Sequence, residues 1–196
     1  MDNILELINE IKNYGIENNV PIMSEDTIEE INKIINDNNV HSVLEIGTAI
    51  AYSTICIASN KNINHITSIE RDEEREQIAV SNVEKSKLKN IKLIFDDATN
   101  VELEEKFDLL IIDAAKSQNK RFFEKYKNNL SENGIIIIDN LSFHGYVGKS
   151  SEIKSRNLRQ MIRKVEKFIE FLDSNEEFSV EYIEVGDKLG VCKRKN

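Results

Sequence analysis

The chain has few of the residues that divide or cross-link a protein. Its 196 residues include one proline, Pro21, seven glycines and two cysteines, and no segment is rich in proline, glycine or serine. We therefore expect a single domain over 1–196, with an N-terminal helical extension over 1–38 and no internal repeat. Cys56 and Cys192 lack the spacing of a metal site, which predicts two buried thiols in a reducing compartment and no disulfide framework.

Long hydrophobic runs are also absent. No run approaches the ~20 apolar residues of a membrane span, and the N-terminal segment has apolar residues at helical intervals without a basic leader. We expect a cytoplasmic protein with no membrane partner. The net charge of −9 disfavours a generic nucleic-acid binder.

Hydrophobic spacing predicts alternating helices and strands through the middle of the chain. Helices are expected near 2–19, 24–37, 51–60, 72–88, 117–129 and 150–174. Strands are expected near 41–47, 65–70, 91–96, 107–113, 134–139, 178–186 and 188–194. The runs LLIID and IIIID are continuously apolar, as in parallel strands covered on both faces, and Gly186-Asp187 suits an antiparallel edge hairpin. The pattern predicts an α/β fold that binds ligands at the carboxyl ends of its strands.

The segment VLEIGTAIAYS, from Val43 to Ser53, has the layout of a nucleotide-type cofactor pocket. An apolar strand leads through Glu45 and Gly47 into small residues that open a helix. Gly47 permits a sharp turn and a close ligand approach, while Glu45 can accept hydrogen bonds from a ligand. The segment departs from the dinucleotide fingerprint, which has glycines where Ala49 and Tyr52 stand. Alone, it is equally consistent with a simple strand-to-helix turn.

Acidic residues end the next two predicted strands. Glu70 follows Gly47 by 23 residues, at the place where a carboxylate can hold the two hydroxyls of a ribose. The run IKLIFDDAT ends in Asp96 and Asp97, which would lie beside an adenine ring. Each of these residues, taken singly, is also consistent with a helix cap.

A second cluster is predicted at the same rim of the sheet. Asp113 ends one strand, and Asp139 and Asn140 follow the next, so three oxygen donors converge if the two strands are neighbours. Carboxylate and amide oxygens suit Mg²⁺, whereas zinc prefers histidine or cysteine. Turn and helix-cap chemistry is the alternative explanation.

These segments together resemble a known family. LEIGTAIAYS, SIERD, LLIIDAAKSQ and IIIIDN resemble the cation-dependent, S-adenosylmethionine (SAM)-dependent O-methyltransferases, which include catechol and caffeoyl-CoA O-methyltransferases. NNVPIM, IERDEER, IDAAKSQ and RNLRQMIRKVEKF are similar to the bacterial branch that methylates 5-hydroxyuridine in the tRNA anticodon loop. The resemblance implies a Rossmann-like class I methyltransferase fold, with helices on both faces of a seven-stranded, mostly parallel sheet of order 3-2-1-4-5-7-6. We also expect a homodimer.

The resemblance also assigns roles to residues. It places SAM against Met23, Glu45, Gly47, Tyr52, Ser53, Glu70, Asp97, Ala98 and Asp113. It makes Asp113, Asp139 and Asn140 the ligands of Mg²⁺ or Mn²⁺, and Lys116 a general base beside Asp113. Lys116 could instead simply stabilise the oxyanion of the acceptor. Most relatives have glycine where this chain has Ala51, and we expect the methyl group to narrow the cofactor turn slightly.

One segment is basic in this acidic chain. Residues 149–167 hold seven lysines and arginines against two glutamates, a net charge of +5. The helical spacing of Arg156, Arg159, Arg163 and Lys167, with Lys164 beside them, predicts a stripe that contacts tRNA phosphates; a solvated helix face is the alternative. Phe143 and His144 are expected to stack on a flipped-out base or only to pack the loop.

The predicted reaction is methylation of the 5-hydroxyl of 5-hydroxyuridine at the tRNA wobble position, giving 5-methoxyuridine. Its 5-hydroxyl and C4 carbonyl present two adjacent oxygens to a cation, as catechol does. Two alternatives remain from the sequence: a small-molecule catechol or phenol O-methyltransferase, and a non-catalytic SAM-dependent RNA-binding module.

Overall fold

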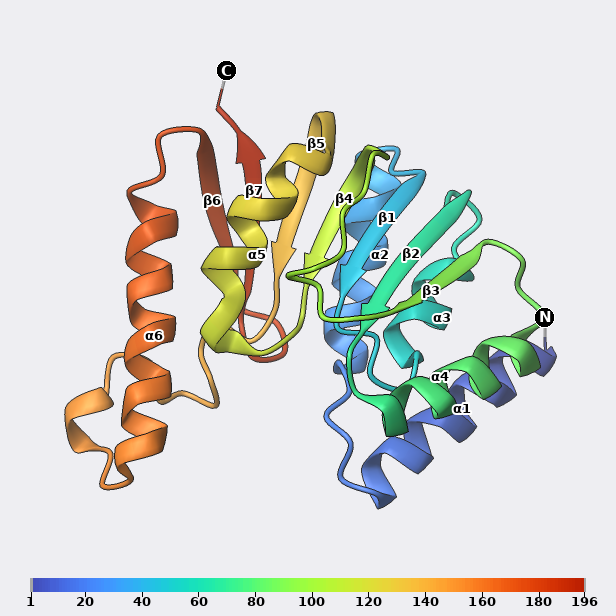
Figure 1. Cartoon of the computed structure of the whole chain (residues 1–196), viewed down its shortest axis with the longest axis horizontal. Helices are drawn as coiled ribbons and strands as arrows, with labels where there is room; N and C mark the ends of the chain where they lie inside the picture. Colours follow the sequence, from blue (N-terminus) through green and yellow to red (C-terminus); the bar gives the residue numbers. More distant parts are fainter. Residues whose placement is uncertain (1, 196) are drawn as a thin grey trace.

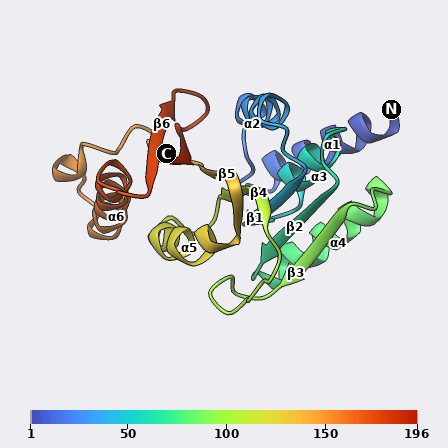
Figure 2. The ribbon, with the colours of Figure 1, turned by 90° about the horizontal axis from the view of Figure 1, so that it is seen from above.

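In the computed structural model, which describes residues 2–195, a seven-stranded sheet runs between two layers of helices (Figures 1 and 2). The strands are β1 (Ser42–Ile46), β2 (His65–Glu70), β3 (Ile91–Phe95), β4 (Phe107–Ile112), β5 (Leu130–Ile138), β6 (Phe178–Ile183) and β7 (Leu189–Arg194). Their order is β3-β2-β1-β4-β5-β7-β6, and β7 runs antiparallel to the other strands. The predicted sheet order and edge hairpin are confirmed.

The helices divide between the two faces of the sheet. One face carries α1 (Asp2–Glu17), α2 (Glu25–Asp37), α3 (Tyr52–Ala58) and α4 (Glu73–Ser86), and the other carries α5 (Asn119–Tyr126) and α6 (Arg156–Asp173). The short 3₁₀ helices are η1 (Lys116–Gln118), η2 (Lys127–Asn129) and η3 (Ser150–Glu152). The predicted helix over 150–174 is therefore divided, because the Ser155 side chain accepts from Leu158 N and begins α6 at Arg156.

Alternate residues of the central strands point to opposite faces, and both faces are buried. Val43, Leu109 and Ile137 pack under α1–α4, whereas Leu44, Leu110 and Ile136 pack under α5 and α6. This double burial explains the continuously apolar strand sequences. Cys192 is buried and Cys56 is partly buried, and both are free thiols. Between residues 2 and 195, no helix is long and apolar enough to cross a membrane.

The strand register places the candidate residues at one level. Ile46 pairs with Ile112, and Ile112 pairs with Ile138, so the segments after β1, β4 and β5 leave the sheet side by side. Parallel strands joined by crossovers carry their carboxyl ends to one rim. The predicted neighbourhood of Asp113 and Asp139 follows from this register.

Candidate active site

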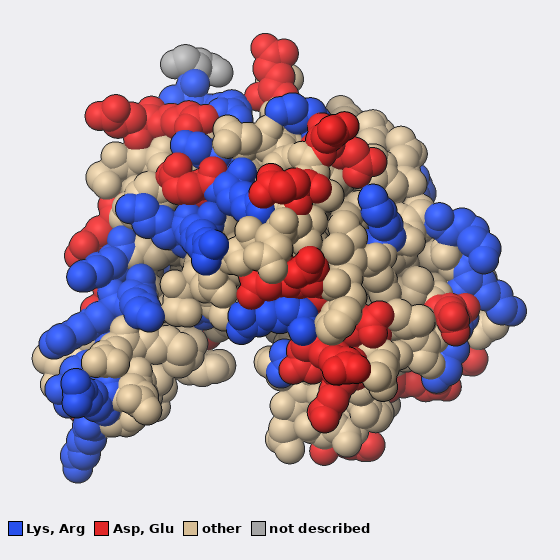
Figure 3. Space-filling view, viewed as in Figure 1, with Lys and Arg blue, Asp and Glu red and all other residues tan. Residues whose placement is uncertain are grey.

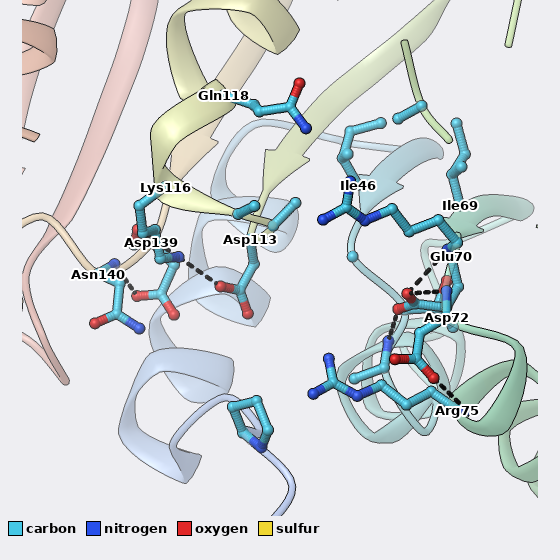
Figure 4. A pocket seen from close by; sticks show the side chains of 18 of the residues that line it. Ile46, Ile69, Glu70, Asp72, Arg75, Asp113, Lys116, Gln118, Asp139 and Asn140 are labelled. Carbon is cyan, nitrogen blue, oxygen red and sulfur yellow. Dashed lines mark hydrogen bonds and ion pairs between the residues drawn. The ribbon is translucent and has the colours of Figure 1, made fainter. Parts of the chain in front are cut away.

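A cavity of about 600 Å³ lies at the carboxyl ends of the parallel strands. Its wall is built from the segments that follow β1, β2, β3, β4 and β5, together with Pro21–Met23 before α2 and Met161 of α6. Figure 4 shows its two ends: Glu70, Asp72 and Arg75 lie on one side, and Asp113, Lys116, Asp139 and Asn140 on the other. We call these the Glu70 end and the Asp113 end. The volume is in the range of small-molecule and cofactor sites.

Gly47 makes the close turn that opens the cavity. Its φ is +107°, and a Cβ built there would lie 2.2 Å from the carbonyl oxygen of Asp113. The backbone NH groups of Gly47 and Thr48 both donate to the carbonyl of Ile69, at 3.0 and 3.3 Å. Glycine at this position therefore lets the segments after β1 and β4 come together under the cavity floor.

Ala51 is strained but does not narrow the cavity. Its φ of 64° and ψ of 25° are left-handed, which explains why glycine suits this position. Its side chain is fully buried and lies outside the cavity wall, which passes from Ala49 to Tyr52. The expectation that its methyl group would narrow the cofactor turn is wrong, because that methyl points into the core.

Replacing Ala51 by glycine should therefore leave ligand binding unchanged. Relief of the left-handed backbone is worth about 1–2 kcal/mol, while the lost buried methyl costs about 0.8 kcal/mol and the added freedom of the unfolded chain about 0.4–1 kcal/mol. These terms nearly cancel, so the free energy of unfolding should change by less than about 1 kcal/mol. Urea unfolding and calorimetric titration with S-adenosylhomocysteine (SAH) measure both quantities; clearly weaker or tighter SAH binding would contradict this account.

Glu45 lies beneath the cavity and not in its wall. The carboxylate is fully buried and accepts hydrogen bonds from the hydroxyls of Ser53 at 2.6 Å, Thr54 at 2.5 Å and Ser68 at 2.6 Å. Burial raises its pKa, and the three hydroxyls oppose that shift. The prediction that Glu45 contacts the ligand directly is wrong, because its side chain points toward α3. It acts instead through a hydrogen bond from Ser53, which does line the cavity.

Glu70 is fixed by backbone amides with its carboxylate in the cavity wall. Its Oε2 accepts from Ala49 N at 2.7 Å, and its Oε1 accepts from Arg71 N and Asp72 N, both at 2.9 Å. A carboxylate has about four acceptor sites, so roughly one remains for a ligand hydroxyl. The orientation suits the role that the sequence predicted.

Asp97 and Ala98 continue the wall from the segment after β3. Hydrogen bonds from the backbone and the side chain of Thr99, with a smaller contribution from Arg71, hold the pKa of Asp97 below its usual range. Ala98 is held by its carbonyl, which accepts from the Tyr126 hydroxyl at 2.6 Å. Met23 and Tyr52 also line the cavity, and burial raises the pKa of Tyr52 to about 12.

Several wall residues escaped the sequence analysis. Arg71 bridges to Asp97 at 3.1 Å, and Asp72, Arg75, Gln118, Phe122 and Met161 also line the cavity. Arg71 and Asp72 directly follow Glu70, so their position after a strand was a usable signal. Met161 comes from α6, far along the chain, and no sequence spacing places it here.

The Asp113 end gathers charged and polar groups from the segments after β4 and β5. Lys116 Nζ donates to Asp113 Oδ1 at 2.8 Å and to the carbonyl of Asp139 at 3.2 Å, and its side chain is only 10% exposed. Asp139 is buried, and its Oδ1 accepts from Asn140 N at 2.8 Å. Burial, followed by repulsion from Asp113, raises the pKa of Asp139, against the opposing charge of Lys116.

This cluster fits a hard divalent cation. Oδ1 of Asn140 is buried and accepts no hydrogen bond from the described residues. Carboxylate and amide oxygens from the ends of neighbouring strands are the kinds of ligand that Mg²⁺ or Mn²⁺ takes. Within residues 2–195 no group of three His, Cys, Asp or Glu side chains is arranged to hold a metal ion.

The basic residues of α6 lie away from the cavity. At about 100° per residue, Arg156, Arg163 and Lys167 fall on the side of α6 opposite Met161, and all three are exposed. Lys164 is also exposed and lies nearer to the Met161 side. Figure 3 shows basic side chains gathered at the left of the molecule, over α6 and the segment before it.

Arg159 does not belong to this exposed stripe. Its Nε and Nη2 donate to the carbonyl of Ile153, at 2.9 and 2.6 Å, and the side chain is half-buried. The prediction that Arg159 contacts tRNA phosphates is therefore corrected to a structural role, because its guanidinium closes the turn before α6.

The sheet order and the neighbouring solved structures define a Rossmann-like class I methyltransferase fold. The chain belongs to the O-methyltransferase family, whose model matches residues 3–195. This assignment favours an enzyme over a non-catalytic binding module.

Individual relatives are consistent with that family. A Staphylococcus aureus protein provisionally assigned as a caffeoyl-CoA O-methyltransferase has a crystal structure with 35% identity and a TM-score of 0.90, covering 96% of this chain and 92% of that one. Caffeoyl-CoA O-methyltransferase of Populus kitakamiensis is 25% identical over 166 residues, which are 80% of this chain and 71% of that protein. The O-methyltransferase of Bacillus cereus in complex with SAH shares the fold, with 23% identity, a TM-score of 0.82 and coverage of 97% and 91%.

Proposed function

We propose that this protein transfers a methyl group from SAM to the 5-hydroxyl of 5-hydroxyuridine at the wobble position of tRNA, with Mg²⁺ or Mn²⁺ bound at the Asp113 end. The observation that carries the proposal is that one cavity has two chemically different ends. An oriented carboxylate at the Glu70 end suits the ribose of a nucleoside cofactor. Two carboxylates and a free amide oxygen at the Asp113 end suit a cation and the oxygens that it binds.

The chain's residues have separate tasks in this reaction. Methyl transfer is an in-line displacement in which an O–C bond forms, the C–S bond breaks and its electron pair stays on sulfur, so the acceptor must be held in line. When bound, the divalent cation lowers the pKa of a coordinated hydroxyl and fixes its direction through a second, adjacent oxygen. Asp113, Asp139 and Asn140 would hold the cation beside the cavity.

Lys116 would stabilise the acceptor oxygen. It donates to Asp113 and to the Asp139 carbonyl, so a protonated amine keeps one NH for the developing oxyanion. Of the two roles that the sequence left open for Lys116, this arrangement favours oxyanion stabilisation over the general base that the resemblance implies. The hydroxyl proton would then pass to solvent.

Two features support tRNA as the acceptor. Phe143 and His144 line the cavity just beyond Asn140, where a flipped-out base would lie. The exposed cations Arg156, Arg163, Lys164 and Lys167 lie on the neighbouring helix, where phosphates outside the cavity could meet them. We also propose a homodimer, which size-exclusion chromatography with light scattering would test.

Reversing charge on the outer face of α6 should weaken tRNA use without changing the chemical step. Arg163→Glu with Lys167→Glu should raise KM for tRNA about tenfold, and the slope of log KM against log salt should fall by roughly one unit per lost phosphate contact. The kcat for the nucleoside 5-hydroxyuridine should be unchanged. Lys89→Glu with Lys92→Glu is the charge-matched control, since these exposed lysines lie at and beside β3, the opposite edge of the sheet. Equal losses in both double variants would make the stripe an ordinary solvated face.

A small-molecule catechol or phenol O-methyltransferase is the second candidate, favoured by relatives named caffeoyl-CoA O-methyltransferase. Both reactions need the same cation and cofactor ends. Purified protein offered a 5-hydroxyuridine anticodon stem-loop and catechol, with SAM and Mg²⁺, separates them by which acceptor gains the methyl group. Mass spectrometry of tRNA nucleosides from a deletion strain then tests whether the reaction takes place in the cell. Loss of 5-methoxyuridine supports the tRNA reaction, and its persistence refutes it.

A further inference from the structure

The loop after β5, residues 141–145, has an unusual backbone where it forms the cavity wall. Phe143, His144 and Gly145 have φ values of 46°, 56° and 74°, so three consecutive residues are left-handed. Two of them are not glycine and are therefore strained. Phe143 and His144 are also the two residues of this loop that line the cavity. Such a conformation persists only where its surroundings hold it.

Asp187, in the turn between β6 and β7, holds this loop. Both of its carboxylate oxygens accept from His144 N at 2.8 Å, and its Oδ1 also accepts from the Ser142 hydroxyl. Its backbone carbonyl accepts from Ser142 N at 3.0 Å. The Asp187 side chain thus accepts a hydrogen bond from the His144 amide, at the centre of the strained segment, and from Ser142, just before that segment.

The turn that carries Asp187 is itself fixed from the other side. Gly186 packs so closely on the start of α2 that a Cβ there would lie 2.2 Å from Thr27 Oγ1 and 3.0 Å from Ser24 Oγ. The residues just before α2, Pro21–Met23, form another part of the cavity wall. The β6–β7 turn is therefore packed between the start of α2 and loop 141–145, which limits how far Asp187 can move.

We propose that Asp187 is a positioning residue for the methyl acceptor. Its carboxylate keeps loop 141–145 in the strained conformation that places Phe143 and His144 beside Asn140, and so sets the shape of the Asp113 end. It makes no contact with the Glu70 end, where its loss should have no effect. The inference rests on the proposed function only in taking the Asp113 end as the acceptor side.

The test compares Asp187→Ala and Asp187→Asn with Glu184→Ala. Glu184 lies in the same turn, but its carboxylate pairs with Lys188 and not with loop 141–145, so it controls for any change to the turn. Hydrogen exchange reports the protection of the His144 amide, and calorimetry reports SAH binding. Steady-state kinetics use whichever of the 5-hydroxyuridine stem-loop, the nucleoside and catechol the wild type methylates.

For Asp187→Ala we expect faster exchange confined to peptides covering 141–145, unchanged SAH affinity and a KM for the acceptor about tenfold higher. Asp187→Asn keeps one acceptor oxygen and should recover part of this loss, and Glu184→Ala should match the wild type. Unchanged protection of His144, or equal weakening of SAH and acceptor, would overturn the proposal. If the wild type methylates none of the three acceptors, the proposed function fails, while hydrogen exchange and SAH binding still decide the role of Asp187.

Discussion

Asp139→Ala should lower kcat by about 10²- to 10³-fold while SAH binds with wild-type affinity. Asp139 lies at the Asp113 end, where its buried carboxylate has Asp113 and Asn140 as neighbours, and it takes no part in the Glu70 end. Asn140→Ala should have a similar effect, because it removes the free amide oxygen. Asp113→Ala is less clean, since the Asp113 side chain also accepts a hydrogen bond from Lys116 and Asp113 lines the cavity. Single-turnover methylation and calorimetry with SAH measure the two effects separately.

A stability measurement strengthens this test. Burial and a like charge raise the pKa of Asp139, so its ionised form destabilises the cation-free protein. Asp139→Asn should therefore unfold at a Tm no lower than wild type when the metal is chelated, although its turnover is lost. The control is Glu102→Ala, which breaks a carboxylate–lysine pair of 2.9 Å whose two residues are not part of the cavity wall, and it should leave kcat unchanged. Full activity of the wild type in excess EDTA would refute the cation role.

Much of the fold could be predicted because burial imposes a simple pattern on the strands. The runs LLII and IIII that precede Asp113 and Asp139 are apolar at every position because successive residues, such as Leu109 and Leu110, face different helix layers. The divided helix before Arg156 was missed. Ser155 fits a helical pattern as well as it fits an N-cap, and only the backbone at Ile153 decides between them.

The site was predictable where strand ends alone determine it. Glu70, Asp113, Asp139 and Asn140 all line the cavity because parallel strands end on one rim. Glu45 fails this rule, since it precedes the last residue of β1 and its side chain faces α3. Its hydrogen-bond partners Ser53, Thr54 and Ser68 come from two other elements, and no sequence spacing indicates that they lie around Glu45.

Arg159 shows a related limit of helical spacing. Helical periodicity places Arg159 on the same side of α6 as the other basic residues of the stripe. Its guanidinium nevertheless donates to the carbonyl of Ile153 in the turn before the helix. Periodicity gives the direction of a side chain from the helix axis. It does not reveal a carbonyl within reach of a long side chain.

Gly47→Ala should both distort the cavity wall and destabilise the fold. The new Cβ would lie 2.2 Å from the carbonyl oxygen and 2.8 Å from the carbonyl carbon of Asp113, and φ is +107°. Both contacts are with backbone, so β1 and β4 must separate at their carboxyl ends. We expect a loss of about 2–4 kcal/mol in the free energy of unfolding and SAH binding at least about 100-fold weaker. Urea unfolding and SAH calorimetry measure these losses.

Gly148→Ala is the control that separates the two effects of Gly47→Ala, the clash of the new Cβ with Asp113 and the strain of a positive φ. Gly148 also has a positive φ, +84°, but a Cβ there would meet nothing within 4 Å. Its substitution should cost only the left-handed strain of about 1–2 kcal/mol and leave SAH binding intact. If the two variants lose similar stability and both bind SAH normally, the close approach of Gly47 to Asp113 does not shape the cavity. A selective loss of SAH binding in Gly47→Ala would instead show that the turn after β1 and the segment after β4 form one binding surface, with Asp113 as their point of contact.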